Sequence, residues 1–214
     1  MRSLLWALPG KILALVAGIY YYRRLQFEYR LILLQVALAF IAECFGEYLI
    51  FQHQYNTWSF NIYILADMLL TGWCARLLLA KYKYSYLVTY MLAFLTVWWV
   101  IEIYDHGIFH WATLFFTGSC VLLVSLYIVV LFNKLLFTKK IIKEPAFWLS
   151  ISVILYFGCC LPYFGMLNYL VSEKSTAAKQ LWVINRWLNF SRYPLIAVCF
   201  ITAGMQQKKV LKPA

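Results

Sequence analysis

The chain has 214 residues, of which 64% are hydrophobic and 13% are charged, and its formal net charge at pH 7 is +11. Soluble domains usually carry about 25% charged residues, so this composition excludes an ordinary soluble protein and indicates a membrane protein. The positive charge does not indicate a nucleic-acid partner, because the lysines and arginines cluster in short connections between apolar segments. The sequence therefore predicts one all-helical transmembrane domain over 1–214.

Seven apolar segments follow one another along the chain. A helix needs about 20 predominantly apolar residues to cross a bilayer. The segments of suitable length are 4–22, 30–52, 58–80, 84–104, 109–132, 146–170 and 182–204. Their short connections predict a bundle of seven transmembrane helices in which sequence neighbours pack antiparallel. Lys11 interrupts the first segment, and Leu15 is too large for the position before a signal-peptide cleavage site. We therefore interpret this segment as an uncleaved helix.

The basic residues fall on alternate connections and so predict an orientation. Thirteen of the 19 lie in the first, third and fifth connections and the C-terminal tail: Arg23, Arg24, Arg30, Arg76, Lys81, Lys83, Lys134, Lys139, Lys140, Lys143, Lys208, Lys209 and Lys212. The second and fourth connections, around 52–57 and 105–107, contain none. Because basic connections face the cytoplasm, we expect the N-terminus outside, the C-terminus inside, and insertion in the cytoplasmic (inner) membrane.

Half of the acidic residues lie inside the apolar segments. These four are Glu43, Glu47, Asp67 and Glu102. A lone charge in hydrocarbon costs at least ~3 kcal/mol on insertion scales, so such residues mark a functional site or a buried partner. At 1.5 Å per residue, Glu43 lies about 20 Å beyond Arg30, and Asp67 lies about 14 Å beyond Trp58. All four are therefore expected between the midplane and the outer surface.

The seventh segment supplies the expected partners. Asn185, Asn189 and Arg192 share one helical face, and Arg186 lies beside it. An arginine fork binds a carboxylate with two parallel hydrogen bonds. We therefore expect an outward-opening polar pocket formed by Glu43, Glu47, Asp67, Glu102, Asn185, Arg186, Asn189 and Arg192. The alternative is a closed network of ion pairs that only holds the helices together.

All three histidines are expected at the outer mouth, near Asp105: His53, His106 and His110. His106 and His110 are four residues apart and would bind one metal ion together if they lay on a helix. Gly107 favours a turn between them. The preferred interpretation is therefore solvated loop histidines with no cofactor, and a histidine-based pH sensor is a further alternative.

Three groups of residues carry a resemblance to known proteins: Asn61 with Asp67, Phe147-Trp148 with Tyr156-Phe157-Gly158, and Trp182 with Asn185 and Asn189. Their order resembles that of small bacterial seven-helix membrane modules, mostly uncharacterised, some of which form the membrane portion of sensor histidine kinases. The chain has no kinase domain and nine residues after Met205. The resemblance therefore implies a bacterial sensor that signals through a separate cytoplasmic protein.

Several functions are compatible with this pattern. A sensory or ligand-binding module in contact with membrane lipids is preferred. The alternatives are a small-solute or proton-coupled transporter, and a lipid-acting enzyme in which Glu43, Glu47 and Asp67 serve as general acid and base. A structural subunit is a further alternative. A retinal protein of the usual kind is excluded because 182–204 contains no lysine. No feature of the sequence indicates an oligomeric state.

Overall fold

The computed structural model describes most of the chain. The described backbone covers 8–82, 85–137, 140–172 and 176–210, and the described side chains leave out 134–137, 163–186 and 208–210 within it. Over these ranges all regular elements are helices, as predicted. The helices are α1 (Leu8–Tyr21), η1 (Tyr22–Arg24), α2 (Phe27–Phe51), α3 (Thr57–Leu78), α4 (Ser85–His106), α5 (Thr113–Phe137), η2 (Ile141–Lys143), α6 (Pro145–Ser172) and α7 (Thr176–Val210). Each of the seven α-helices overlaps one predicted segment.

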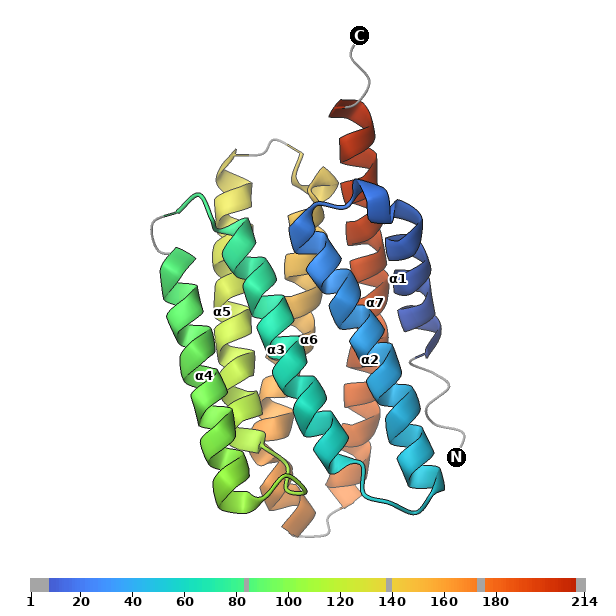
Figure 1. The fold of residues 1–214 in the computed structure, drawn as a ribbon, viewed down its shortest axis with the longest axis vertical. Helices are drawn as coiled ribbons and strands as arrows, with labels where there is room; N and C mark the ends of the chain where they lie inside the picture. The colour runs from blue at the N-terminus through green and yellow to red at the C-terminus, as the bar shows by residue number, and fades with distance from the viewer. Residues whose placement is uncertain (1–7, 83–84, 138–139, 173–175, 211–214) are drawn as a thin grey trace.

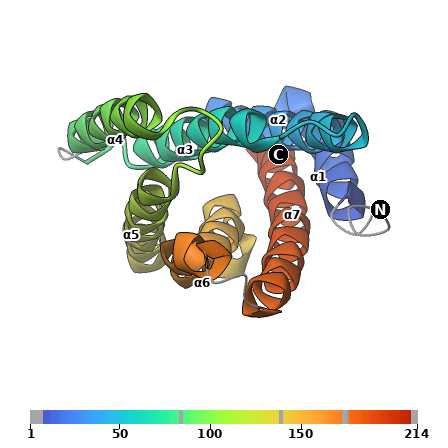
Figure 2. The same cartoon turned by 90° about the horizontal axis from the view of Figure 1, so that it is seen from below.

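Successive helices run up and down in two layers (Figure 1). Figure 2 shows α1, α2, α3 and α4 side by side in one row, with α5, α6 and α7 forming the second layer. The connections that follow α1, α3 and α5 lie at one end, together with the C-terminal end of α7. We call this the basic end because it carries the exposed residues Arg23, Arg24, Lys81, Lys140 and Lys143. The connections that follow α2 and α4, together with the C-terminal end of α6 and the N-terminal end of α7, lie at the opposite end.

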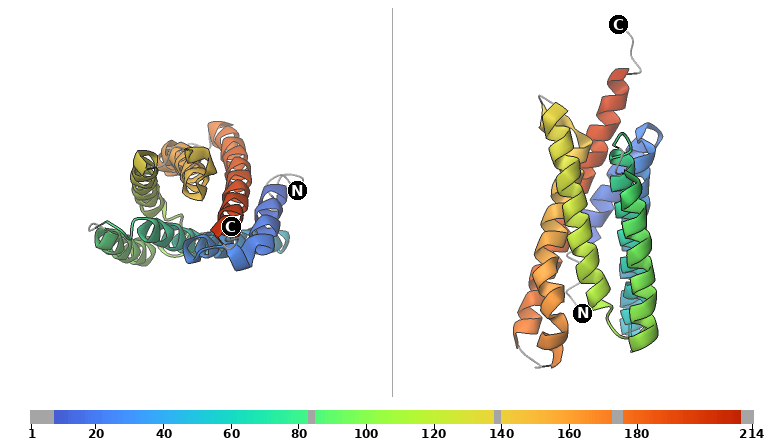
Figure 3. Two further views of the ribbon diagram at one scale, coloured as in Figure 1. Left: turned by 90° about the horizontal axis from the view of Figure 1, so that it is seen from above. Right: turned by 90° about the vertical axis from the view of Figure 1, so that its left-hand side faces the viewer.

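Helix α7 links the two layers. It contacts α6 along the second layer and α1, η1 and α2 in the first. Figure 3 shows it slanting from a position beside α1 at the basic end to one beside α6 at the opposite end. A side chain near the middle of α7 can therefore reach helices of the first layer.

Five helices are long and apolar enough to cross a membrane, which supports a multi-pass membrane protein. The crossing segments are Phe27–Phe51, Ser85–His106, Thr113–Asn133, Pro145–Pro162 and Trp187–Gln207. Helix α1 has 14 residues, so it measures about 21 Å and is shorter than a hydrocarbon core of about 30 Å. Helix α3 has 22 residues, which is long enough, but it buries polar side chains such as Asn61, Asp67 and Thr71.

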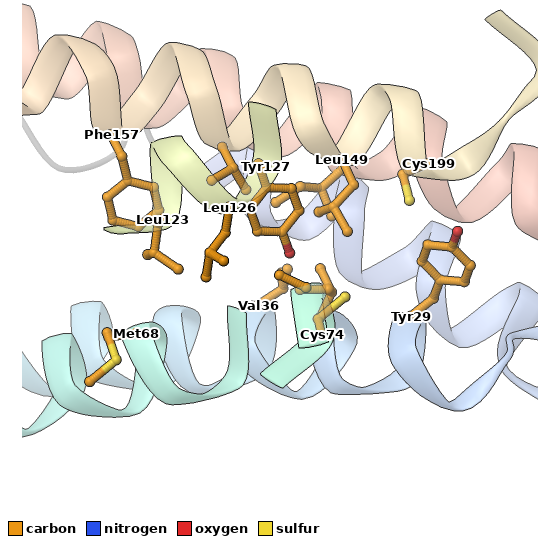
Figure 4. Packing of buried hydrophobic residues seen from close by; sticks show 14 of the residues in the cluster. Tyr29, Val36, Met68, Cys74, Leu123, Leu126, Tyr127, Leu149, Phe157 and Cys199 are labelled. Atoms are coloured by element: carbon orange, nitrogen blue, oxygen red, sulfur yellow. The ribbon is translucent and has the colours of Figure 1, made fainter. Parts of the chain in front are cut away.

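The core lies between the layers. Figure 4 shows Tyr127 of α5 and Leu149 of α6 facing Val36 of α2 and Cys74 of α3. All four side chains are buried. The Tyr127 hydroxyl donates a hydrogen bond to the Thr71 carbonyl oxygen at 3.0 Å, so this large side chain satisfies its one polar group while it fills the space between layers.

Helix α1 packs through small residues. Gly10, Ala14 and Gly18 are four residues apart and buried, so they form one narrow stripe. A Cβ atom on Gly10 would lie 3.2 Å from the Phe190 carbonyl oxygen of α7. Small residues at this spacing let helix backbones approach closely in membranes, and here they seat α1 against α7.

Enlarging this stripe should destabilise the bundle. We expect Ala14→Leu to lower the free energy of unfolding by about 1–3 kcal/mol, because the fully buried site has no room for three more carbon atoms. A thiol-reactive fluorescent dye, which labels buried cysteines such as Cys199 as the protein unfolds, would measure this loss in detergent. The control is Ala93→Leu, the same change at an exposed position of α4. Equal stabilities of the two variants would contradict the packing assigned to α1.

Candidate functional site

A bidentate ion pair joins α3 of the first layer to α7 of the second. The Arg192 guanidinium donates from Nη1 to Asp67 Oδ2 and from Nη2 to Asp67 Oδ1, each at 3.0 Å. Arg192 is 2% exposed and Asp67 is 4% exposed. The Thr71 hydroxyl, one helical turn from Asp67, donates a further bond to Oδ1 at 3.1 Å. This pairing is one of those predicted from the depths of the two residues in their segments.

Aromatic rings enclose the arginine. Its guanidinium carbon lies 4.7 Å from the ring centre of Tyr156 and 4.9 Å from that of Phe157, both on α6. Cation–π attraction of this kind is strongest where water is excluded. The two rings and the carboxylate together offset the cost of removing the arginine from water.

A second buried ion pair lies beside the first. Lys11 of α1 pairs with Glu43 of α2, and both side chains are at most one-tenth exposed. The Lys11 ammonium lies 5.2 Å from the ring centre of Tyr193, which follows Arg192 on α7. We call Lys11, Glu43, Asp67 and Arg192 the charged centre. It contains two positive and two negative groups and joins α1, α2, α3 and α7.

Polar atoms without hydrogen bonds lie in and near this centre. Arg192 Nε and Gln35 Oε1 are buried and have no hydrogen-bond partner in the structure. The Gln35 amide nitrogen donates to the Tyr63 hydroxyl at 3.2 Å, and Tyr63 lies one helical turn from Asp67 on α3. Buried donors and acceptors are nearly always paired, but four further buried side-chain atoms of the described residues also have no partner: Arg76 Nε, Thr89 Oγ1, Trp99 Nε1 and Ser150 Oγ. Unpaired polar atoms therefore do not by themselves mark the charged centre as a binding site.

Glu47 continues the acidic stripe of α2 beyond the charged centre. It lies one turn from Glu43 toward the opposite end and is half-buried. Among the described side chains no ion-pair partner of Glu47 is found. Its carboxylate therefore places a negative charge next to the balanced centre, on the side that the sequence predicts to face outward.

Glu102 has a different partner from the one expected. Its two carboxylate oxygens accept the backbone N–H groups of Leu114, at 3.1 Å, and Phe115, at 2.7 Å. These are unpaired donors in the first turn of α5, where a carboxylate also interacts favourably with the helix dipole. Glu102 is therefore a helix cap that links α4 to α5, and among the described side chains it forms no ion pair with Arg192, which binds Asp67.

Asn61 holds the connection between α4 and α5. Its amide nitrogen donates to the carbonyl oxygens of Ile108, at 2.8 Å, and His110, at 2.7 Å, and its amide oxygen accepts the N–H of Ala112 at 3.3 Å. The side chain is fully buried. One asparagine thus orders the irregular segment that follows Gly107. Asn61 and Asp67, which together contribute to the resemblance described above, therefore have separate structural roles.

The histidines lie on the exposed surface at the opposite end. Helix α4 ends at His106, and Gly107 has a φ of +80°, so the predicted turn is confirmed. The rings of His106 and His110 stack with centres 5.5 Å apart. His53 and Asp105 are also exposed. No group of three His, Cys, Asp or Glu suited to a metal ion occurs among the described residues.

Two residues of the expected pocket are not described beyond their backbone. Asn185 and Arg186 belong to α7, but their side chains lie outside the described residues. Asn189 is half-buried on the same helix. Of the residues expected to form the pocket, the structure therefore places Glu43, Asp67 and Arg192 in the charged centre, Glu47 one turn from Glu43, and Asn189 on α7.

Lys11 is a candidate that the sequence pattern does not single out beyond an interruption of an apolar segment. The physical rule that singles out Glu43 applies equally to a lone lysine in such a segment, because both charges need a buried partner. A count of the charges of both signs in all seven segments adds Lys11 to the possible partners of the buried acids, and the structure pairs it with Glu43.

The Asp67–Arg192 pair should be strongly coupled. Arg192→Gln leaves a buried carboxylate unpaired, so we expect a loss of about 3–5 kcal/mol in the free energy of unfolding. Asp67→Asn should cost a similar amount, and the double variant should cost less than the sum of the two. Unfolding in detergent measures all three variants, with Arg24→Gln as the control for an exposed arginine. Additive losses would contradict a direct pair.

Asn61 should control the order of the α4–α5 connection. Asn61→Ala removes three hydrogen bonds, so we expect faster amide hydrogen exchange at 108–112, while α2 and α6 keep their protection. The control is Asn133→Ala, which removes an amide near the other end of α5. Unchanged exchange at 108–112 would show that other contacts hold this connection.

No protein-family model, curated protein or solved structure matches the chain. The positions of its charged and polar side chains are therefore the guide to its function.

Proposed function

We propose that this chain is a sensory or ligand-binding module of the cytoplasmic membrane, which responds to a small polar or amphipathic molecule and signals through a separate cytoplasmic protein. The observation that carries this proposal is the charged centre, whose two ion pairs join α1, α2, α3 and α7. A molecule that exchanges one of these pairs for its own polar groups would change the contacts of four helices at once.

The proposal uses the orientation given by the basic residues. The basic end faces the cytoplasm, and successive helices run toward it and away from it in turn. Helix α1 extends through about 21 Å of the membrane thickness. The charged centre then opens toward the outside through Glu47, and the basic end is the surface that meets the partner. The helices that connect the charged centre to the basic end transmit a displacement along their length. The partner therefore receives the signal through movements of the helix ends.

Packing between the centre and the basic end favours sensing over transport. Alternating access needs polar lining on both sides of a central site. Toward the basic end the described interior contains buried apolar side chains such as Val36, Leu149 and Cys199 and a smaller number of buried polar ones, including Gln35, Ser150 and Ser152. These polar groups are uncharged, so a charged solute would lose its compensation on this path, whereas a ligand that enters and leaves from the outer side does not need the path.

A thermal-unfolding screen tests this function. We expect a compound from a panel of anionic, zwitterionic and neutral small molecules to raise the unfolding temperature of the detergent-purified protein, because a ligand that binds only the folded state stabilises it. The effect should be lost in Glu47→Gln, which removes the charge next to the centre. It should persist in Glu28→Gln, a half-buried acid at the other end of the same helix. Stabilisation that is equal in both variants, or found with no compound, would favour a closed ion-pair network.

A further inference from the structure

Helix α1 presents an apolar face to the outside of the bundle. Five large side chains on it are between 48% and 79% exposed: Ile12, Leu13, Val16, Ile19 and Tyr20. The opposite face carries the small residues that pack on α7 and α2. The helix measures about 21 Å, somewhat more than the ~15 Å hydrocarbon thickness of one leaflet. Its exposed face therefore lies alongside acyl chains over most of its length.

The basic end of this face carries arginines on a tight turn. Helix η1 follows α1 directly, and Tyr22, Arg23 and Arg24 are all exposed on it. The turn is closed by the Leu25 N–H, which donates to the Tyr21 carbonyl at 3.1 Å and to the Tyr22 carbonyl at 3.2 Å. Both guanidinium groups are thus attached to a fixed backbone at the level where the apolar face ends.

Arg30 fixes the turn from α2. Its guanidinium lies 5.0 Å from the ring centre of Tyr22, and its Nε donates to the Leu25 carbonyl oxygen at 2.9 Å. The nearby acid of this helix is Glu28, in the first turn of α2. Three arginines and one carboxylate leave this corner of the bundle with a net positive charge.

Exposed arginines distinguish this corner from the rest of the basic end, where Arg76 is half-buried in the last turn of α3 with its guanidinium 4.4 Å from the ring centre of Trp73. The exposed basic residues described on the other connections are lysines: Lys81, Lys140 and Lys143. A guanidinium fork binds a phosphate with two parallel hydrogen bonds, whereas an ammonium acts as a point charge. The turn therefore has the residue type suited to a phosphate, at the headgroup level of a membrane.

We propose that an anionic phospholipid binds at this corner, with its phosphate on Arg23 and Arg24 and an acyl chain along the exposed face of α1. The basic side chains compensate the charge of the headgroup, and the apolar face takes the chain. This lipid site lies on the periphery of the bundle at its basic end, and it is independent of the ligand proposed for the charged centre.

Native mass spectrometry tests this site. The probe is an equimolar mixture of phosphatidylglycerol and phosphatidylcholine with identical acyl chains, added to the detergent-purified protein. We expect the wild type to retain phosphatidylglycerol several-fold over phosphatidylcholine, and Arg23→Gln/Arg24→Gln to lose this preference. The matched control, Lys140→Gln/Lys143→Gln, removes two exposed charges from the same end and should keep it.

A third variant separates charge from geometry. Arg23→Lys/Arg24→Lys keeps both charges but removes the guanidinium forks, so it should retain less phosphatidylglycerol than the wild type and more than the glutamine variant. Thermal unfolding checks that all variants are folded. If Arg23→Gln/Arg24→Gln and Lys140→Gln/Lys143→Gln lose the preference for phosphatidylglycerol equally, the proposal is overturned in favour of general attraction to the basic end. A wild type that shows no preference for phosphatidylglycerol would also overturn it.

Discussion

The arrangement of the helices depends on the compensation of charges that are buried away from water. Asp67 and Arg192 are both almost fully buried, and neither is tolerable alone in a medium of low polarity. Their bidentate contact fixes the distance and rotation of α3 relative to α7. Since α7 slants between the layers (Figure 3), this pair sets the point at which the second layer meets the first.

The same constraint explains the place of α1. This helix is short and packs through small side chains, so its apolar contacts alone are limited. Lys11 extends its attachment to Glu43 of α2 and to the ring of Tyr193 on α7. Seating a short helix beside the charged centre lets its lysine balance the second carboxylate, so that the centre as a whole carries no net charge.

Polar groups at the opposite end of the bundle serve the backbone. Glu102 and Asn61 both bind main-chain groups around the start of α5, where a helix begins with unpaired N–H groups. These contacts rigidify the end of the bundle through which the proposed ligand enters. The charged centre, by contrast, is built from side chains of opposite charge that bind one another. Contacts to the backbone hold a helix end in place, whereas contacts between charged side chains are ones that the polar groups of the proposed ligand can exchange.

The sequence by itself determined the class of fold and the positions of the helices. Hydrophobic length and short connections define helices locally, so the predicted 58–80 and 84–104 agree closely with α3 and α4. The depths of Asp67 and Arg192 also made their pairing foreseeable. Depth alone could not decide which carboxylate meets which cation, because the rotation of each helix and its neighbours are set by packing. The tertiary structure therefore decided that Glu43 pairs with Lys11 and that Glu102 caps α5, since these contacts join residues that no local pattern connects.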